Sequence, residues 1–116
     1  MFIRGESISE FDFEGIKIRD YTVGQDLNAS VALITVAAGI GHKRALSALS
    51  EKYYFVVEGR ISFRIGGEKQ DLGAGDFCFV PKSTEFSYEC LDQKAKMIVV
   101  HAPAYDSSAE VFIGDK

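Results

Sequence analysis

The sequence predicts a single domain that is built almost entirely of β-strands and closes as a sandwich or barrel. Three observations lead to this fold class: apolar and polar residues alternate in short segments, β-branched residues fill the continuous apolar runs, and Gly or Pro follows most segments. Alternation with a period of two is typical of a half-buried strand. Short strands at regular spacing with turn residues between them indicate a sandwich or barrel.

The expected strands follow one another along the whole chain. They cover 16–19, 31–37, 53–57, 61–65, 77–80, 86–90 and 97–101. The segment 61–65 alternates apolar and polar residues and ends at two glycines, which is a hairpin signal. One segment differs: KRALSALSEK at 43–52 consists of good helix formers, and a short helix there is an equal alternative.

Size and charge limit the classes of function. The chain has 116 residues, 47% of them hydrophobic, and a formal net charge of −4, which fits one globular domain over 1–116. Mild acidity argues against a nucleic-acid partner. No apolar run approaches the roughly 20 residues that span a bilayer. The N-terminal MFIRGESISEF lacks the apolar core of a secretory signal, so we expect a cytoplasmic protein with no membrane partner.

Two segments carry glycine, aromatic and acidic residues in a specific order. They are EKYYFVVEG at 51–59 and GDFCFVP at 75–81, with 15 residues between Gly59 and Gly75. These segments resemble the two motifs of the cupin superfamily, which here would cover about 39–59 and about 75–90. The resemblance implies a small single-domain, RmlC-like cupin, whose fold is an all-β double-stranded β-helix, or jelly-roll barrel.

The resemblance also implies where a metal ion would bind, and those positions have lost their ligands. Metal-binding cupins use two histidines and a glutamate from the first motif and a third histidine from the second. Here the glutamate position falls on Lys52, the third histidine position falls on Phe86, and positions 45–48 hold no histidine. The chain has only two histidines. We therefore expect no cofactor and no metal at the family's usual place.

The candidate binding pocket is the barrel interior. Its expected residues are Lys52, Tyr54, Val56, Phe86 and Tyr88. An inward Lys52 would have a lowered pKa and could act as a nucleophile or in proton transfer. A strand phase shifted by one residue would instead place Glu51 inside. Because the residues in phase with Glu51 are the more apolar set, the sequence favours a solvent-exposed Lys52.

The sequence suggests specific roles for four residues, which are Phe86, Tyr88, His42 and His101. Phe86 and Tyr88 either stack on a flat ligand or, as is more common in small barrels, simply fill the interior. His42, beside two basic residues in a glycine-flanked turn, is a general base, a displaced metal ligand or, more often in such a setting, a surface residue. His101 is expected to be a satisfied core or rim histidine.

A metal site of a different kind can also be written down. His42, His101 and either Glu51 or Glu85 would form two histidines and one carboxylate, the ligand set of a non-haem iron triad. No spacing in the sequence supports this grouping.

Three functional hypotheses remain. The preferred one is a metal-free cupin that binds a small molecule in its barrel or acts through assembly. The second is an enzyme, either like the sugar-nucleotide isomerases and epimerases, with His101 and Tyr54 or Tyr88 facing inward, or a dioxygenase with rearranged metal ligands. The third is a structural module without a pocket, which an open cavity near Tyr54, Phe86 and Tyr88 would contradict.

A homodimer is expected. The resemblance implies one, because small cupins usually pair. Independently, the segments 31–37 and 53–57 are apolar on both faces, which is more apolar surface than one small barrel buries.

Overall fold

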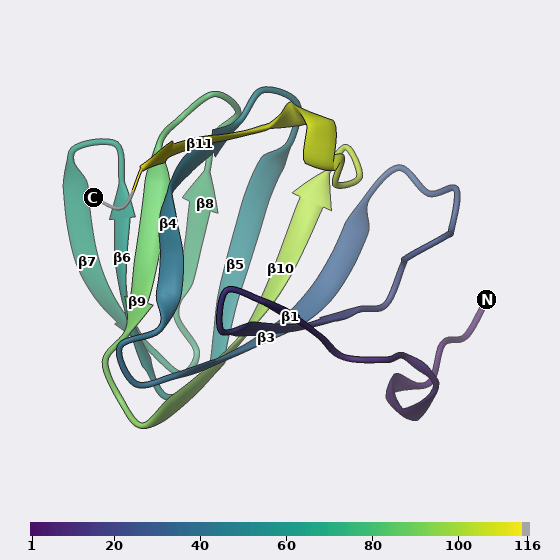
Figure 1. The fold of residues 1–116 in the computed structure, drawn as a ribbon, viewed down its shortest axis with the longest axis horizontal. Helices are drawn as coiled ribbons and strands as arrows, with labels where there is room; N and C mark the ends of the chain where they lie inside the picture. The colour runs from purple at the N-terminus through teal and green to yellow at the C-terminus, as the bar shows by residue number, and fades with distance from the viewer. Residues whose placement is uncertain (115–116) are drawn as a thin grey trace.

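The regular structure of the computed structural model, which describes residues 1–114, is almost all β-strand (Figure 1). The strands are β1 (Phe11–Phe13), β2 (Ile16–Asp20), β3 (Ser30–Ala37), β4 (Gly41–Ser47), β5 (Glu51–Glu58), β6 (Arg60–Ile65), β7 (Glu68–Gly73), β8 (Phe77–Val80), β9 (Phe86–Cys90), β10 (Lys94–Ala102) and β11 (Glu110–Gly114). Two short 3-10 helices are η1 (Gly5–Ser7) and η2 (Ser107–Ala109). The all-β prediction is confirmed, and every expected strand is present.

The strands form two antiparallel sheets that face each other. The larger sheet has the order β1-β2-β3-β10-β5-β8, and the smaller sheet has the order β11-β4-β9-β6-β7. In Figure 1, β11 lies beside β4, whereas the N-terminus projects away from the barrel. Within residues 1–114, no helix has the length and apolarity that crossing a bilayer requires.

The core lies between the sheets and is filled by alternate residues of the central strands. In β3, β5 and β10 these are Ile34 and Val36, Tyr54 and Val56, and Met97 and Val99. They come from strands that are neighbours in the larger sheet, because β10 pairs with both β3 and β5. The predicted period of two therefore specifies which residues point inward.

Residues 43–52 do not form the helix that their composition allowed. Most of the segment belongs to β4 and β5, and the two strands are joined by a tight turn. The Ser47 hydroxyl closes this turn by accepting a hydrogen bond of 2.8 Å from the Ser50 N–H. Because β4 pairs with β9 on one side and β11 on the other, sheet pairing overrides the local helix propensity.

The phase of β5 is opposite to the one that the sequence favoured. Lys52 points into the barrel with Tyr54 and Val56 and is only 2% exposed, so the prediction of a solvent-exposed Lys52 is wrong. The more apolar set faces outward, and Phe55 is 45% exposed. Apolarity misled the prediction because the outward set has another apolar neighbour, the adjacent edge strand β8.

Aromatic residues of β5 and β8 together form a patch that we call the outer aromatic face. It consists of Tyr53, Phe55, Phe77 and Phe79. The Tyr53 ring lies 5.1 Å from that of Phe79 and 6.4 Å from that of Phe77, between ring centroids. The patch lies on the side of the larger sheet that faces away from the core.

Candidate functional site

A partly enclosed cavity of about 190 Å³ lies between the two sheets. Its walls are mostly apolar and aromatic, with a small set of polar residues: Asp20, Ser30, His42, Lys52, His101 and Glu110. An apolar hollow with a few polar groups is the usual character of a small-molecule site. The cavity contradicts the hypothesis of a structural module without a pocket.

The structure brings together only part of the predicted pocket. Lys52, Tyr54 and Tyr88 line the cavity. Val56 and Phe86 are fully buried in the core and do not reach its wall. Phe86 therefore fills the barrel, which is the more common of its two alternative roles.

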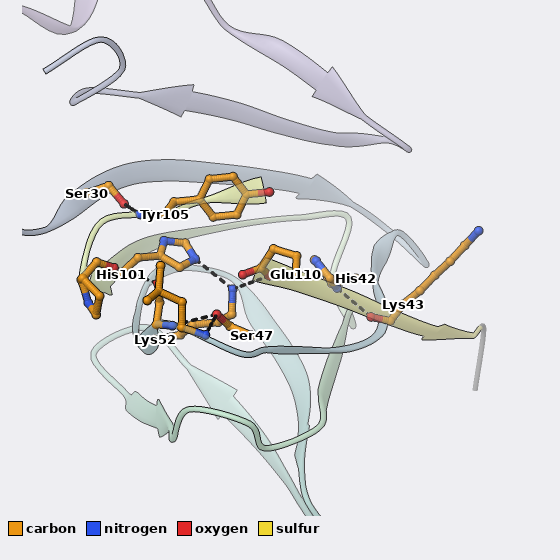
Figure 2. Close-up of polar contacts among 11 residues, drawn as sticks. Ser30, His42, Lys43, Ser47, Lys52, His101, Tyr105 and Glu110 are labelled. Atoms are coloured by element: carbon orange, nitrogen blue, oxygen red, sulfur yellow. Dashed lines mark hydrogen bonds and ion pairs between the residues drawn. The ribbon is translucent and has the colours of Figure 1, made fainter. Parts of the chain in front are cut away.

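Lys52 is held by two partners from distant parts of the chain. Figure 2 shows its ammonium between His101 of β10 and Glu110 of β11. Lys52 Nζ donates to Glu110 Oε1 at 2.9 Å and to His101 Nε2 at 3.0 Å. Both charged side chains are almost fully buried, at 3% and 4% exposed. The ammonium also lies 5.1 Å from the centroid of the Phe86 ring. These contacts allow a lysine inside the barrel.

The same contacts determine the protonation state of His101. An ammonium can only donate, so His101 Nε2 must accept, and the ring is neutral with its proton on Nδ1. Burial, together with the positive charge of Lys52, lowers the pKa of His101 to about 3. Burial likewise lowers the pKa of Lys52, while the hydrogen bond to Glu110 opposes that shift. His101 is thus the satisfied histidine that the sequence predicted.

His42 is partly buried against aromatic rings, so the interpretation of it as a surface residue is wrong. Its ring stacks on Phe112 with 5.7 Å between ring centroids and 12° between planes, and it lies 4.9 Å from the Phe86 ring. Its Nδ1 lies 2.7 Å from the Lys43 carbonyl oxygen. A carbonyl can only accept, so Nδ1 carries the proton and Nε2 keeps its lone pair. Burial lowers the pKa of His42, which keeps the ring neutral at pH 7.

A close backbone contact fixes the position of His42. Gly41 lies against the Tyr88 carbonyl of β9, and a Cβ at Gly41 would overlap that carbonyl and the backbone of Glu89. Only glycine permits this approach. His42, the next residue of β4, is therefore held close to Tyr88, with which it pairs across the two strands and shares the cavity.

The two cavity tyrosines remain protonated. Burial raises the pKa of both Tyr54 and Tyr88 well above the ordinary value. Their ring centroids lie 5.7 Å apart in an edge-on arrangement. Within residues 1–114, neither hydroxyl has a hydrogen-bond partner that would compete with a ligand. Both hydroxyls are thus free to donate hydrogen bonds into the cavity.

The residues present do not fit a metal ion. The positions that metal-binding cupins use for glutamate and the third histidine hold Lys52, which is committed to an ion pair, and Phe86, which has no donor atom. Among the described residues, no three or more His, Cys, Asp or Glu side chains gather into a possible metal centre. The grouping of His42 and His101 with Glu51 or Glu85 is therefore not formed.

Sequence reasoning missed Glu110 and Tyr105. Both lie beyond the second motif: Tyr105 precedes β11, and Glu110 is its first residue. Tyr105 N–H donates to Ser30 Oγ at 2.8 Å, and its ring packs edge-on against His101. One signal in the sequence could have indicated Glu110. It is a single acidic residue directly before the apolar run VFI, an arrangement that can begin a half-buried strand.

Replacing Lys52 by Met should destabilise the protein by about 3–5 kcal/mol, because it leaves the Glu110 carboxylate buried without a counter-charge. The double variant Lys52→Met/Glu110→Leu removes both charges and should recover much of that loss. Urea unfolding at pH 7 measures the free energy of unfolding of both variants. A double variant as unstable as the single one would contradict the ion-pair argument.

The His101 environment predicts an acid-dependent loss of stability. Since the pKa of His101 is about 3 in the folded chain and about 6.5 when unfolded, the unfolded state binds the extra proton as the pH falls. The contribution of His101 to the free energy of unfolding is fully present above pH 6.5. Below that pH the contribution decreases, by up to about 1.4 kcal/mol per pH unit. His101→Gln keeps an acceptor for Lys52 and should reduce this slope between pH 6.5 and 4, measured by urea unfolding. An unchanged slope would show that His101 is not the titrating group.

A family model described as the cupin domain matches residues 33–101. No curated protein matches the chain. Among solved structures, a single-substitution variant of Streptomyces Pac13 with uridine superimposes with a TM-score of 0.85 and 27% identity over 98% of this chain and 91% of that chain. Another Pac13 structure, described as that of a unique nucleoside dehydratase, has a TM-score of 0.83 and 28% identity over 99% and 94% of the two chains.

An RmlC-like cupin of Shewanella frigidimarina is also similar, with a TM-score of 0.81 and 23% identity over 92% of this chain and 94% of that chain. That similarity supports the fold alone. The family match is decisive, because residues 33–101 are more than half of the chain. With its two facing antiparallel sheets, this protein belongs to the cupin family.

Proposed function

We propose that this cupin binds a neutral nucleoside-like molecule in its cavity and catalyses a dehydration by acid–base chemistry, without a metal ion. The observation that carries the proposal is the state of His42. Its ring is neutral, held by the Lys43 carbonyl through Nδ1 and packed between aromatic rings, and its Nε2 is free to take a proton. A positioned neutral imidazole is the most common general base.

The neighbouring tyrosines supply the complementary group. Removal of water from adjacent carbons breaks one C–H bond and one C–O bond, forms a C=C bond, and releases water, with no oxidant or reductant. His42 Nε2 takes the proton from carbon. The hydroxyl of Tyr54 or Tyr88, which its raised pKa keeps protonated, donates to the departing oxygen.

The base is weak, which limits the substrates. Imidazole removes a proton readily only from a carbon that a neighbouring carbonyl acidifies. A suitable substrate therefore carries a carbonyl next to the reacting C–H and a hydroxyl on the following carbon. A tyrosine that is not donating to the leaving oxygen can donate to that carbonyl as negative charge develops on it.

Two observations support a nucleoside as the ligand. Pac13 is 27–28% identical over nearly the whole chain, has been solved with uridine and is described as a nucleoside dehydratase. The cavity also fits a ring-shaped ligand, since roughly 150 Å³ already holds a benzene molecule and this one measures about 190 Å³. Its aromatic walls, including Phe13 and Phe112, suit a flat base.

His42→Gln should separate binding from catalysis. Glutamine keeps polarity and approximate size but cannot take up a proton, so turnover should fall by roughly 10²–10⁴-fold while uridine affinity changes little. The probes are uridine for calorimetric binding, and carbonyl derivatives of uridine oxidised on the sugar for activity, followed as loss of water by mass spectrometry. The rate should fall as the pH drops through a pKa below 6.5, because burial lowers that of His42.

Tyrosine variants supply the matched control for this prediction. Tyr88→Phe removes a cavity hydroxyl and should slow turnover. Tyr53→Phe removes a hydroxyl that bonds Glu51 on the outer side of the same sheet and should leave the rate unchanged. Full activity in His42→Gln would rule out the proposed base.

We also propose that two chains pair through the outer aromatic face. Four aromatic side chains on adjoining strands are costly to leave in water, and Phe77 is 56% exposed. β8 is an edge strand of the larger sheet, so its outer backbone groups are also available to a partner. An apolar patch next to an open sheet edge is well suited to a symmetric dimer.

Light scattering after size-exclusion chromatography should report two chains per particle at micromolar concentration. The variant Phe55→Lys/Phe77→Lys should be monomeric, because it places two like charges in the contact. Val111→Lys, a partly exposed apolar position outside this face, is the control and should remain dimeric. A monomeric wild-type protein would contradict the pairing.

A further inference from the structure

Glu110 contains a buried polar atom that the proposed chemistry does not use. It is the first residue of β11, and its backbone pairs with Ser47 of β4. This pairing directs the carboxylate into the barrel, where its side chain is 4% exposed and forms part of the cavity wall. Glu110 thus presents a negative charge to whatever occupies the cavity.

The two oxygens of this carboxylate differ. Oε1 accepts the hydrogen bond from Lys52 Nζ, as Figure 2 shows. Oε2 is buried and has no hydrogen-bond partner among residues 1–114. A buried acceptor without a partner destabilises the structure, and a carboxylate oxygen more than most. Glu110 lines the cavity, and a rotation of its carboxylate would bring this atom to a ligand that carries the missing donor.

We propose that Glu110 Oε2 accepts a hydrogen bond from a sugar hydroxyl of the bound nucleoside, and that it makes the cavity select nucleosides over nucleoside phosphates. This inference rests on the proposed function, because it assigns one contact within that same site. Glu110 acts here as a binding residue, and the proton transfers remain with His42 and the tyrosines.

The sugar is favoured over the base by the distribution of polar groups. The flat apolar rings Phe13 and Phe112 provide stacking surface for a base. Glu110 lies instead beside Lys52, which donates both to Glu110 Oε1 and to His101 Nε2. A hydroxyl is a donor that can approach this polar corner and satisfy Oε2 without a charge of its own.

The charges of the wall disfavour a phosphate. The charged lining residues are Asp20, Lys52 and Glu110, one cation against two anions, while His42 and His101 are neutral. Lys52 is already shared between Glu110 and His101. No arginine is present among the described lining residues, although arginine is the side chain best suited to bind phosphate through two parallel hydrogen bonds. A phosphate group would therefore meet net negative charge.

The test is calorimetric titration of the full chain with uridine, 2′-deoxyuridine, 3′-deoxyuridine, N3-methyluridine and uridine 5′-monophosphate. Wild-type protein should lose about tenfold or more in affinity when one sugar hydroxyl is removed, since a hydrogen bond to a charged group is lost. N3-methylation should have little effect on affinity. The monophosphate should bind at least about tenfold more weakly than uridine.

Glu110→Gln tests the same contact from the protein side. The variant should bind uridine about tenfold more weakly and should no longer distinguish uridine from the sensitive deoxyuridine. The ratio of its affinity for uridine to its affinity for the monophosphate should also decrease. The matched control is Glu58→Gln, the same change at an exposed glutamate that pairs with Lys94, and it should bind like the wild type.

The outcomes separate this inference from the proposed function. If wild-type protein binds uridine but does not distinguish it from either deoxyuridine, the Glu110 contact is wrong and the proposed function stands. Loss of affinity on N3-methylation alone would likewise overturn the sugar assignment. If wild-type protein binds no nucleoside, both fail together. Should Glu110→Gln not fold, the wild-type series alone decides.

Discussion

A lysine–glutamate ion pair inside the barrel determines much of this structure. Transfer of an ammonium and a carboxylate out of water costs several kcal/mol for each ion, and only close contact with further hydrogen bonds compensates for that cost. Lys52 meets this condition through Glu110 and His101. With Lys52 inside, the alternation of β5 places Phe55 on the outer surface. The exposed aromatic patch is therefore a consequence of the buried charge.

The two histidines show how environment assigns different chemistry to the same side chain. Both are neutral, and burial is the first cause in each case. In His101 the lone pair on Nε2 is used by Lys52, which removes it as a base. In His42 the Nδ1–H donates a hydrogen bond to the backbone carbonyl of Lys43, so the lone pair on Nε2 stays free. The positions of the hydrogen bonds, more than the pKa values, distinguish a structural imidazole from a reactive one.

Much of the fold was predictable from the sequence because each of the seven expected strands carries its own local signal. The alternation at 61–65 and the glycine-punctuated apolar runs needed no knowledge of distant residues. β4 lacked such a signal, because its strand form comes from pairing with β9 and β11, which are far away in sequence. Local propensity alone therefore left a helix open there.

The candidate site was only partly predictable for the same reason. Lys52, Tyr54 and Tyr88 were found because two motifs and strand alternation mark the barrel interior. The orientation of Lys52 depends on Glu110, which lies outside both motifs. Apolarity alone therefore favoured the wrong face of β5. His42 was assigned to the surface because its charged neighbours suggested solvent, whereas the aromatic wall around it includes Phe112 from a strand that was not predicted.

The distance along the chain between the partners of the ion pair has a consequence for folding kinetics. Lys52 and Glu110 are 58 positions apart, so their contact requires closure of a long loop. Contacts of this range form slowly, because the entropy of closure is lost before the contact stabilises the chain. Until β11 pairs with β4, an unpaired lysine charge keeps the barrel interior hydrated. Final desolvation of the cavity and docking of β11 should therefore be one cooperative event on the folding pathway.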